Sequence, residues 1–244
     1  MTTLASFFRS IDAVVDAFLV SVDASPTPQR ADLCRLEGTL AGEPVFLTTD
    51  VFSARGYQRI AWARMATASG RDVTRTVVAL PRGGCPVVGL DVVAMRDKLS
   101  LFALDLAPID IDEWESWARL AMIDARREVP AFVPRPTPAF TEGTFSEYAM
   151  IGTVPDGALP NAGLVAAVDV ALMRASAFAA DDASSPEAHA RLCAWLTAES
   201  SNRKEIGALG RIFGVDVATR YFGELLFRLP ERPASPSMRA ASGE

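Results

Sequence analysis

Asp91 is the only charged side chain in an otherwise apolar run from Pro86 to Ala94. An isolated carboxylate is costly to bury without a partner or a function. If the side chain is buried against an apolar surface, its pKa rises and the group can hold a proton near neutral pH, as a general acid must. The alternative is that Asp91 points to water from an exposed strand face. Its alternation partners Gly89 and Val93 do not decide between these two readings.

The other side chains that could carry chemistry are few. The single histidine, His189, has no nearby nucleophile or second ligand, so we place it on a helix surface rather than in a catalytic triad. Cys34, Cys85 and Cys193 lack the paired spacing of a zinc site, an iron–sulfur site or a disulfide framework. Gly83-Gly84 lacks the glycine spacing and helix start of a nucleotide site. The sequence therefore predicts no bound metal or nucleotide.

The composition excludes several further classes of function. The chain has 244 residues, half of them apolar, and a formal net charge of −6. No apolar run approaches the roughly 20 residues of a membrane span, and the charges within residues 4–22 argue against a secretory signal. We therefore expect a cytoplasmic protein without a membrane partner. No basic run is longer than Arg126-Arg127, so nucleic acid is not expected as the main partner.

The elements that must position Asp91 follow from apolar spacing and turn residues. Residues 4–22 have the pattern of an amphipathic helix. Strands are predicted over residues 32–40, 44–50, 74–80, 86–94 and 99–106, and helices over about 57–68, 109–127, 159–180, 186–198 and 202–226. Four prolines favour an extended loop over residues 129–141. This order predicts an antiparallel sheet covered by helices, in one domain over residues 1–229 with a disordered tail over 230–244.

Four segments of the chain resemble motifs of the ferredoxin-dependent bilin reductases, in the family's order and at nearly its spacing. They are Pro86 to Val93, with Val88 in place of a phenylalanine; Leu99 to Pro108; Phe145-Ser146-Glu147-Tyr148; and Asn202 to Phe227. The resemblance spans about residues 33–227. It implies an α/β fold, a three-layer α/β/α sandwich with a central antiparallel sheet, which agrees with the strand pattern.

The resemblance also implies a function. Family members reduce CH–CH groups of a linear tetrapyrrole, here biliverdin or a dihydrobiliverdin, with electrons that reduced ferredoxin supplies one at a time. They bind no cofactor of their own. Because the net charge of −6 would repel an acidic partner, docking of ferredoxin would need a local basic patch.

Site residues follow from the same register. Asp91 falls where the family places a proton donor. A bilin carries two propionate carboxylates on a flat apolar frame, so its pocket needs cations or hydroxyls beside apolar walls. Ser100, Arg135 and Lys204 fall at the propionate-binding positions, Arg135 only with a one-residue gap; the alternative is that all three are ordinary solvated side chains. Asn202, Arg203, Arg64 and Thr76 fall at further positions of the bilin site.

Three of these positions depart from the family pattern. Phycocyanobilin-forming members have a glutamate and a histidine where this chain has Arg64 and Thr76. Many members also have a second aspartate where this chain has Arg203, and an arginine cannot donate a proton at neutral pH. Asp91 alone remains of the usual donors, which favours a two-electron over a four-electron reduction. Arg64 and Arg203 could instead stabilise a bilin radical anion.

Two other functions stay open at this point. The chain could be a non-catalytic tetrapyrrole binder that has kept the pocket and lost the chemistry. It could also be a related reductase of chlorophyll breakdown products on the same fold. A spectral change on mixing with biliverdin would show binding, and bleaching by reduced ferredoxin would separate a catalyst from a carrier.

Overall fold

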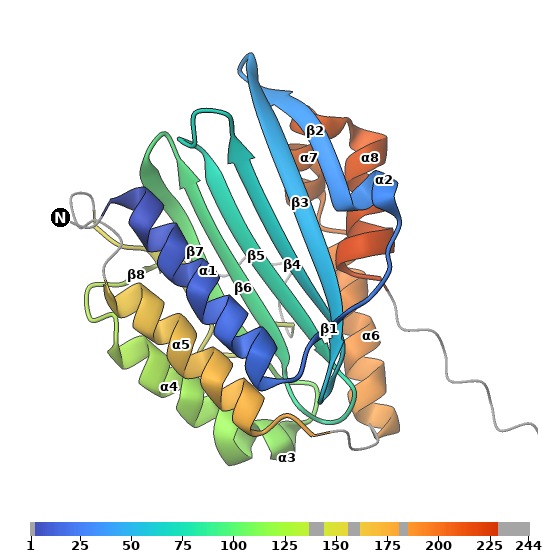
Figure 1. Cartoon of the computed structure of the whole chain (residues 1–244). Helices are drawn as coiled ribbons and strands as arrows, with labels where there is room; N and C mark the ends of the chain where they lie inside the picture. The colour runs from blue at the N-terminus through green and yellow to red at the C-terminus, as the bar shows by residue number, and fades with distance from the viewer. Residues whose placement is uncertain (1–2, 137–143, 156–161, 181–184, 229–244) are drawn as a thin grey trace, which may run out of the picture.

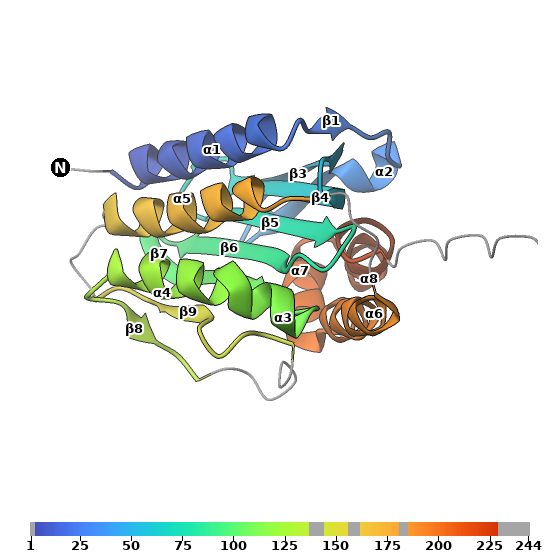
Figure 2. The same cartoon turned by 90° about the horizontal axis from the view of Figure 1, so that it is seen from below.

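A central antiparallel sheet lies between two layers of helices (Figures 1 and 2). The computed structural model describes residues 3–136, 144–155, 162–180 and 185–228. The predicted three-layer α/β/α class is confirmed. The predicted disordered tail over residues 230–244 lies outside the described residues.

The described residues contain nine strands, and every pairing between them is antiparallel. They are β1 (Ser25–Pro26), β2 (Arg35–Leu40), β3 (Glu43–Ala54), β4 (Tyr57–Thr67), β5 (Val73–Pro81), β6 (Val87–Met95), β7 (Lys98–Ala107), β8 (Val133–Pro134) and β9 (Met150–Thr153). Their order is β1-β3-β4-β5-β6-β7-β9-β8, with β2 also paired to β3. Strands β6 and β7 are joined by a tight turn in which Arg96 and Asp97 both have positive φ, as a type I′ hairpin requires.

One face of the sheet is fully packed against helices. This layer consists of α1 (Leu4–Ser21), α3 (Ile111–Glu113), the π-helical turn η1 (Trp114–Ala118), α4 (Arg119–Arg127) and α5 (Ala162–Ala177), all in front of the sheet in Figure 1. Phe7, Ile11 and Phe18 of α1 contact the same core as Trp62 and Phe102 of the sheet. The apolar stripe of the first helix thus packs against the sheet, as the amphipathic pattern predicts.

The opposite face carries the C-terminal helices. They are α6 (Pro186–Ser200), α7 (Arg203–Phe213), α8 (Val215–Arg220) and the π-helical turn η3 (Tyr221–Leu226), with the short α2 (Ala31–Cys34) beside them. Trp195 and Leu196 of α6 and Tyr221 of η3 share a second core with Leu47 and Ala61 of the sheet. Tyr221 is fixed to β3 by a hydrogen bond between its hydroxyl and Thr49 Oγ1 at 2.7 Å.

Two predicted elements are wrong. Residues 57–68 form strand β4 rather than a helix. Ile60 and Trp62 face one core while Ala61 and Ala63 face the other, and a strand covered on both faces shows no alternation that separates it from a helix. The predicted helix over 202–226 is interrupted at Gly214, whose positive φ of 92° ends α7, and α8 and η3 follow after it.

The other predicted elements agree with the structure to within a few residues. The proline-rich stretch contains the two-residue strand β8, and its residues 137–143 lie outside the described part of the chain. Strand β9 was not predicted. No helix in the described ranges is long and apolar enough to cross a membrane.

Candidate active site

The sheet face toward the C-terminal helices is open over its central strands. Thr76, Asp91 and Ala103 stand side by side on β5, β6 and β7, and all three are half-buried. On the other face of the same strands, Val92 and Phe102 are completely buried. A Cβ atom added to Gly89 would meet no atom within 4 Å, so there is open space above β6 next to Asp91.

We call this region the open sheet face. It comprises the half-buried side chains that alternate onto one side of β4 to β7 and β9. They are Met65, Thr74, Thr76, Gly89, Asp91, Val93, Leu101, Ala103 and Ile151. Most of these side chains are apolar, and Asp91 is the one ionisable group among them. Strand alternation places them together because each strand contributes every second residue to this face.

Asp91 is held by Thr76 and carries a perturbed pKa. The Thr76 hydroxyl donates a hydrogen bond of 2.8 Å to Asp91 Oδ1. The pKa of Asp91 is raised to about 7, mainly by burial and also by the negative charge of Glu205, against the lowering effect of the Thr76 hydrogen bond. A carboxyl group with this pKa can both hold and release a proton at neutral pH.

Two more acids lie near Asp91, at the junction of α6 and α7. Glu199 is only 6% exposed, and its Oε1 has no hydrogen-bond partner among the described residues. Burial raises the pKa of Glu199 to about 8, helped by the charges of Glu205 and Asp91. Much of the Glu205 side chain is exposed, but its carboxyl group lies close enough to the protein for partial desolvation to raise its pKa, which Lys204 and Asn202 lower.

Sequence reasoning missed Glu199, although a signal was present. Leu192, Trp195, Leu196 and Glu199 follow the i, i+3, i+4, i+7 spacing of a helix face, and all four are buried. An acid in the last place of an apolar stripe points into the protein. That observation would have identified Glu199 as a buried carboxyl.

The turn between α6 and α7 carries three predicted site residues. Asn202 is buried and caps α7, since its side-chain oxygen accepts a hydrogen bond from the Glu205 backbone N–H at 3.3 Å. Its own backbone N–H donates to the Glu199 carbonyl at 3.2 Å, which ties the turn together. Arg203 and Lys204 follow in the first turn of α7, and both are exposed.

Ser100 and Arg135 lie at two borders of the open sheet face. Ser100 is at the bulge where β7 shifts register against β6, and its hydroxyl donates to the Val93 carbonyl at 3.1 Å. Bulges of this kind redirect side chains at the ends of sheets. Arg135 is exposed just after β8, and its backbone N–H donates to the Ile151 carbonyl at 2.8 Å.

The structure does not bring Arg64 to this site. Arg64 pairs with Thr48 and Arg75, one residue out of phase with Ala63 and Thr76, so it points to the α1 side of the sheet. There it forms an ion pair with Asp50 and lies over the Trp62 ring. The sequence-based placement of Arg64 beside the bilin is therefore corrected, because a shift of one residue moves a side chain to the other face.

The Phe-Ser-Glu-Tyr segment has a structural role in this chain. The Ser146 hydroxyl and backbone N–H both donate to the carboxyl group of Asp105, at 2.5 and 2.8 Å. The pKa of Asp105 is raised to about 6, because the effect of burial exceeds that of the hydrogen bonds from Ser146, which lower it. This contact fixes the segment that leads into β9, the strand that borders the open sheet face.

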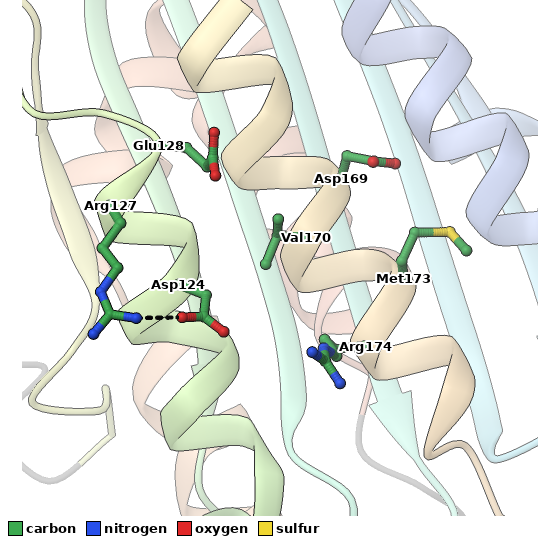
Figure 3. A pocket seen from close by; sticks show the side chains of 7 residues that line it. All are labelled: Asp124, Arg127, Glu128, Asp169, Val170, Met173 and Arg174. Atoms are coloured by element: carbon green, nitrogen blue, oxygen red, sulfur yellow. Dashed lines mark hydrogen bonds and ion pairs between the residues drawn. The ribbon is translucent and has the colours of Figure 1, made fainter.

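A separate groove of about 470 Å³ lies between α4 and α5 (Figure 3). It is lined by Asp124, Arg127, Glu128, Asp169, Val170, Met173 and Arg174, most of them charged. Because α4 and α5 pack on the other face of the sheet, this groove has no access to Asp91. In the described ranges no group of His, Cys, Asp and Glu side chains could hold a metal ion.

Comparison with known proteins gives a consistent result. Residues 11–228 match the family model for ferredoxin-dependent bilin reductase. The phycocyanobilin:ferredoxin oxidoreductases of two Prochlorococcus marinus strains, MIT 9303 and MIT 9313, are each 25% identical over 224 residues, covering 85% of this chain and 80% of theirs. Tomato phytochromobilin synthase, solved in complex with biliverdin, superposes with a TM-score of 0.75 at 15% identity, covering 93% of this chain and 86% of that one. The last match concerns the fold alone.

Proposed function

This chain belongs to the ferredoxin-dependent bilin reductase family, and we propose that it reduces biliverdin or a dihydrobiliverdin by two electrons from reduced ferredoxin. The observation that carries the proposal is Asp91, a carboxyl group with a pKa of about 7 beside the open space above Gly89. The enzyme would be an oxidoreductase that acts on CH–CH groups with an iron–sulfur protein as donor. It needs no cofactor of its own.

The open sheet face suits a flat conjugated ligand. It extends over five neighbouring strands, so it is roughly 19 Å wide at about 4.8 Å per strand. Val93, Leu101 and Ala103 offer apolar surface for pyrrole rings, and Gly89 leaves room directly beside Asp91. A ligand lying on these residues would have its conjugated carbons against the carboxyl group.

The propionates of the ligand would point to the border of the open sheet face. Ser100, Lys204 and Arg135 are our candidates for binding them, with Asn202 and Arg203 beside Lys204. Within the described part of the chain, Arg135, Arg203 and Lys204 form no salt bridge, although the charge of Lys204 acts on Glu205. Charge-assisted contacts of this kind would orient the bilin over Asp91.

In the proposed reaction, each double bond takes up two electrons and two protons. Electrons arrive singly from reduced ferredoxin, and negative charge builds up on the bilin. Asp91 neutralises that charge by transferring its proton to a bilin carbon. Thr76 keeps the carboxyl group oriented toward the ligand during this step.

The proposal is tested by replacing Asp91 with Asn. Asp91→Asn should bind biliverdin with an affinity close to wild type, because the side-chain shape is kept. The rate of reduction by reduced ferredoxin should fall by about 10²–10⁴-fold, the usual effect of removing a general acid. Binding is read from the absorption change of biliverdin, and reduction from its bleaching under anaerobic conditions.

Asp97→Asn is the matched control, since Asp97 is an exposed acid in the turn between β6 and β7. It should behave as wild type. Full reduction by Asp91→Asn would refute the assignment of the proton donor. A wild-type protein that binds biliverdin without bleaching it would be a carrier and not a reductase.

A further inference from the structure

Glu199 is buried in a way that core packing does not explain. Its side chain is 94% removed from solvent, and its Oε1 has no hydrogen-bond partner among the described residues. An unsatisfied buried carboxyl destabilises a fold, so such a group persists where the site uses it. Leu192 and Leu196 on the same stripe of α6 are ordinary apolar core residues, so the position of Glu199 is one where an apolar side chain would be expected.

The surroundings of Glu199 contain a second unmatched polar atom. Trp195 lies one turn earlier on the same face of α6, and its Nε1–H also lacks a partner in the described residues. Residues four apart on a helix are neighbours. One turn of α6 thus contributes an unpaired donor and an unpaired acceptor to an otherwise apolar layer.

The three carboxyl groups near this spot differ in their access to solvent. Asp91 on β6 borders the open space above the sheet, Glu199 on α6 is buried, and Glu205 on α7 is exposed. They are close enough for the charge of Glu205 to raise the pKa of both other acids, and for Asp91 to raise that of Glu199. Lys204 is the cation that acts on Glu205. Trp195 and Leu196, on the same stripe of α6 as Glu199, share a core with Ala63 of β4. Ala63 is the cross-strand neighbour of Thr76, which binds Asp91, so this face of α6 packs over the sheet beside Asp91.

We propose that Glu199 is the proton reserve of this active site, a carboxyl group that reprotonates Asp91 between the two proton transfers of one reduction. The proposal rests on the proposed reductase function. It gives the chain a second acid at a place that none of the family motifs quoted above would indicate, while the position with the family's second aspartate holds Arg203.

The steps balance as follows. The bilin receives one electron from a first reduced ferredoxin and a proton from the Asp91 O–H. Glu199 then releases its proton to the Asp91 carboxylate, either directly or over a bridging water. A second ferredoxin supplies the second electron, and Asp91 supplies the second proton. Asp91 and Glu199 are both carboxylates at this point, and two protons from solvent, entering on the side of Glu205, restore both groups for the next reduction.

Glu199→Gln tests the proposal, because it keeps the shape of the side chain and removes the acid. With biliverdin bound and reduced ferredoxin in excess, rapid-mixing absorption should show a first reduction step at the wild-type rate. The second step should be at least about tenfold slower. Glu199 is protonated up to a pH of about 8. The difference between the second-step rates of wild type and Glu199→Gln should therefore be largest between pH 7 and 8.

Two further variants and one further readout complete the experiment. Glu199→Asp should restore part of the second step, and Glu187→Gln, which changes an exposed acid in the first turn of the same helix, should leave both steps unchanged. Infrared difference spectra at neutral pH should show a protonated carboxyl band that disappears in Glu199→Gln. This band reports on the reserve independently of activity.

The outcomes separate the two proposals. If wild-type protein reduces biliverdin and Glu199→Gln matches it in both steps, the proton reserve is refuted and the reductase function stands. If the infrared band is unchanged in Glu199→Gln, the reserve is likewise refuted. If wild-type protein leaves biliverdin unbleached, the reductase function itself is overturned, and the reserve with it.

Discussion

The contact between Thr76 and Asp91 shows how the chemistry of a single residue depends on its surroundings. The hydroxyl of Thr76 favours the charged form of the carboxyl group, while burial and the charge of Glu205 favour the protonated form. The second influence is the larger, so the pKa lies near 7 instead of near 4. On the opposite face of the sheet, the charged side chain of Arg64 is paired with Asp50.

The pKa of Asp91 predicts the pH dependence of reduction. A proton donor works in its protonated form, and that fraction falls as the pH rises through about 7. The rate constant for the first proton transfer should therefore be level at pH 6 and decline toward tenfold per pH unit above pH 7. Single-turnover bleaching of bound biliverdin across this range measures it. A rate that stays level up to pH 9 would contradict the role of Asp91.

We expect the buried carboxyl group of Glu199 to lower the free energy of unfolding while it supports the reaction. Its pKa is about 8 in the folded protein and 4.5 as the ordinary value, so the unfolded chain releases this proton at lower pH than the folded protein does. The contribution of Glu199 is thus most favourable below pH 4.5 and is lost as the pH rises toward 8. Glu199→Leu should raise the free energy of unfolding by about 1–3 kcal/mol at pH 8, and by less at pH 5.

Urea unfolding at the two pH values measures this difference. Leu192, on the same buried stripe, gives the contrast: Leu192→Ala should destabilise the protein at both pH values by a similar amount, as removal of a core side chain does. A Glu199→Leu variant less stable than wild type at pH 8 would show that Glu199 has an ordinary structural role.

At the scale of elements, strand β6 shows how one strand serves two purposes. Val88, Leu90 and Val92 fill the core under α1 and α5, while Gly89, Asp91 and Val93 form part of the open sheet face. The hairpin turn at Arg96-Asp97 sets the register that brings Ala103 of β7 opposite Asp91.

Gly89→Val tests whether the space above β6 is the ligand site. The added side chain meets no atom within 4 Å, and valine suits a strand, so the melting temperature should stay within a few degrees of wild type. Affinity for biliverdin should fall by at least about tenfold, because the valine occupies the position beside Asp91. Thermal unfolding and absorption titration measure the two effects.

Gly152→Val is the control for tolerance of a larger side chain. A Cβ atom at Gly152 would lie 2.1 Å from the Val133 carbonyl oxygen, so this variant should be clearly destabilised. If Gly89→Val binds biliverdin as wild type does, the ligand lies elsewhere on the protein.

The sequence predicted these elements unevenly, for physical reasons. The first helix and strands β5 to β7 were identified because a one-sided helix, β-branched runs and turn residues leave clear patterns. Strand β4 was taken for a helix because both of its faces are buried. Asp91 and Thr76, which were assigned to the site by register with the family motifs, lie side by side in the sheet, whereas Arg64 lies on the other face, because an error of one residue changes the sheet face.

The acids at the junction of α6 and α7 were missed for a different reason. Glu199 lies outside the segments used for the prediction, and Glu205 lies within the last of them at a position to which no role was assigned. Their proximity to Asp91 arises only when α6 and α7 pack over the sheet. Long-range contacts of this type leave no local pattern, apart from the acid at the end of an apolar stripe on α6.

At the scale of the whole molecule, the two faces of the sheet are covered differently. The layer of α1, α4 and α5 seals one face, while α6 to α8 leave the centre of the other face half-buried (Figures 1 and 2). The half-buried centre of this face is where we propose that the bilin binds. Among the half-buried residues that define the open sheet face, Asp91 is the one ionisable group, and its pKa is about 7.

The most direct test is the absorption spectrum of biliverdin, recorded anaerobically with the wild-type protein before and after reduced ferredoxin is added. We predict a shift of the spectrum on mixing, which shows binding, followed by bleaching with the uptake of two electrons per bilin. An unshifted spectrum, or a shifted one that reduced ferredoxin leaves unchanged, would contradict the central claim that this chain seats and reduces a linear tetrapyrrole.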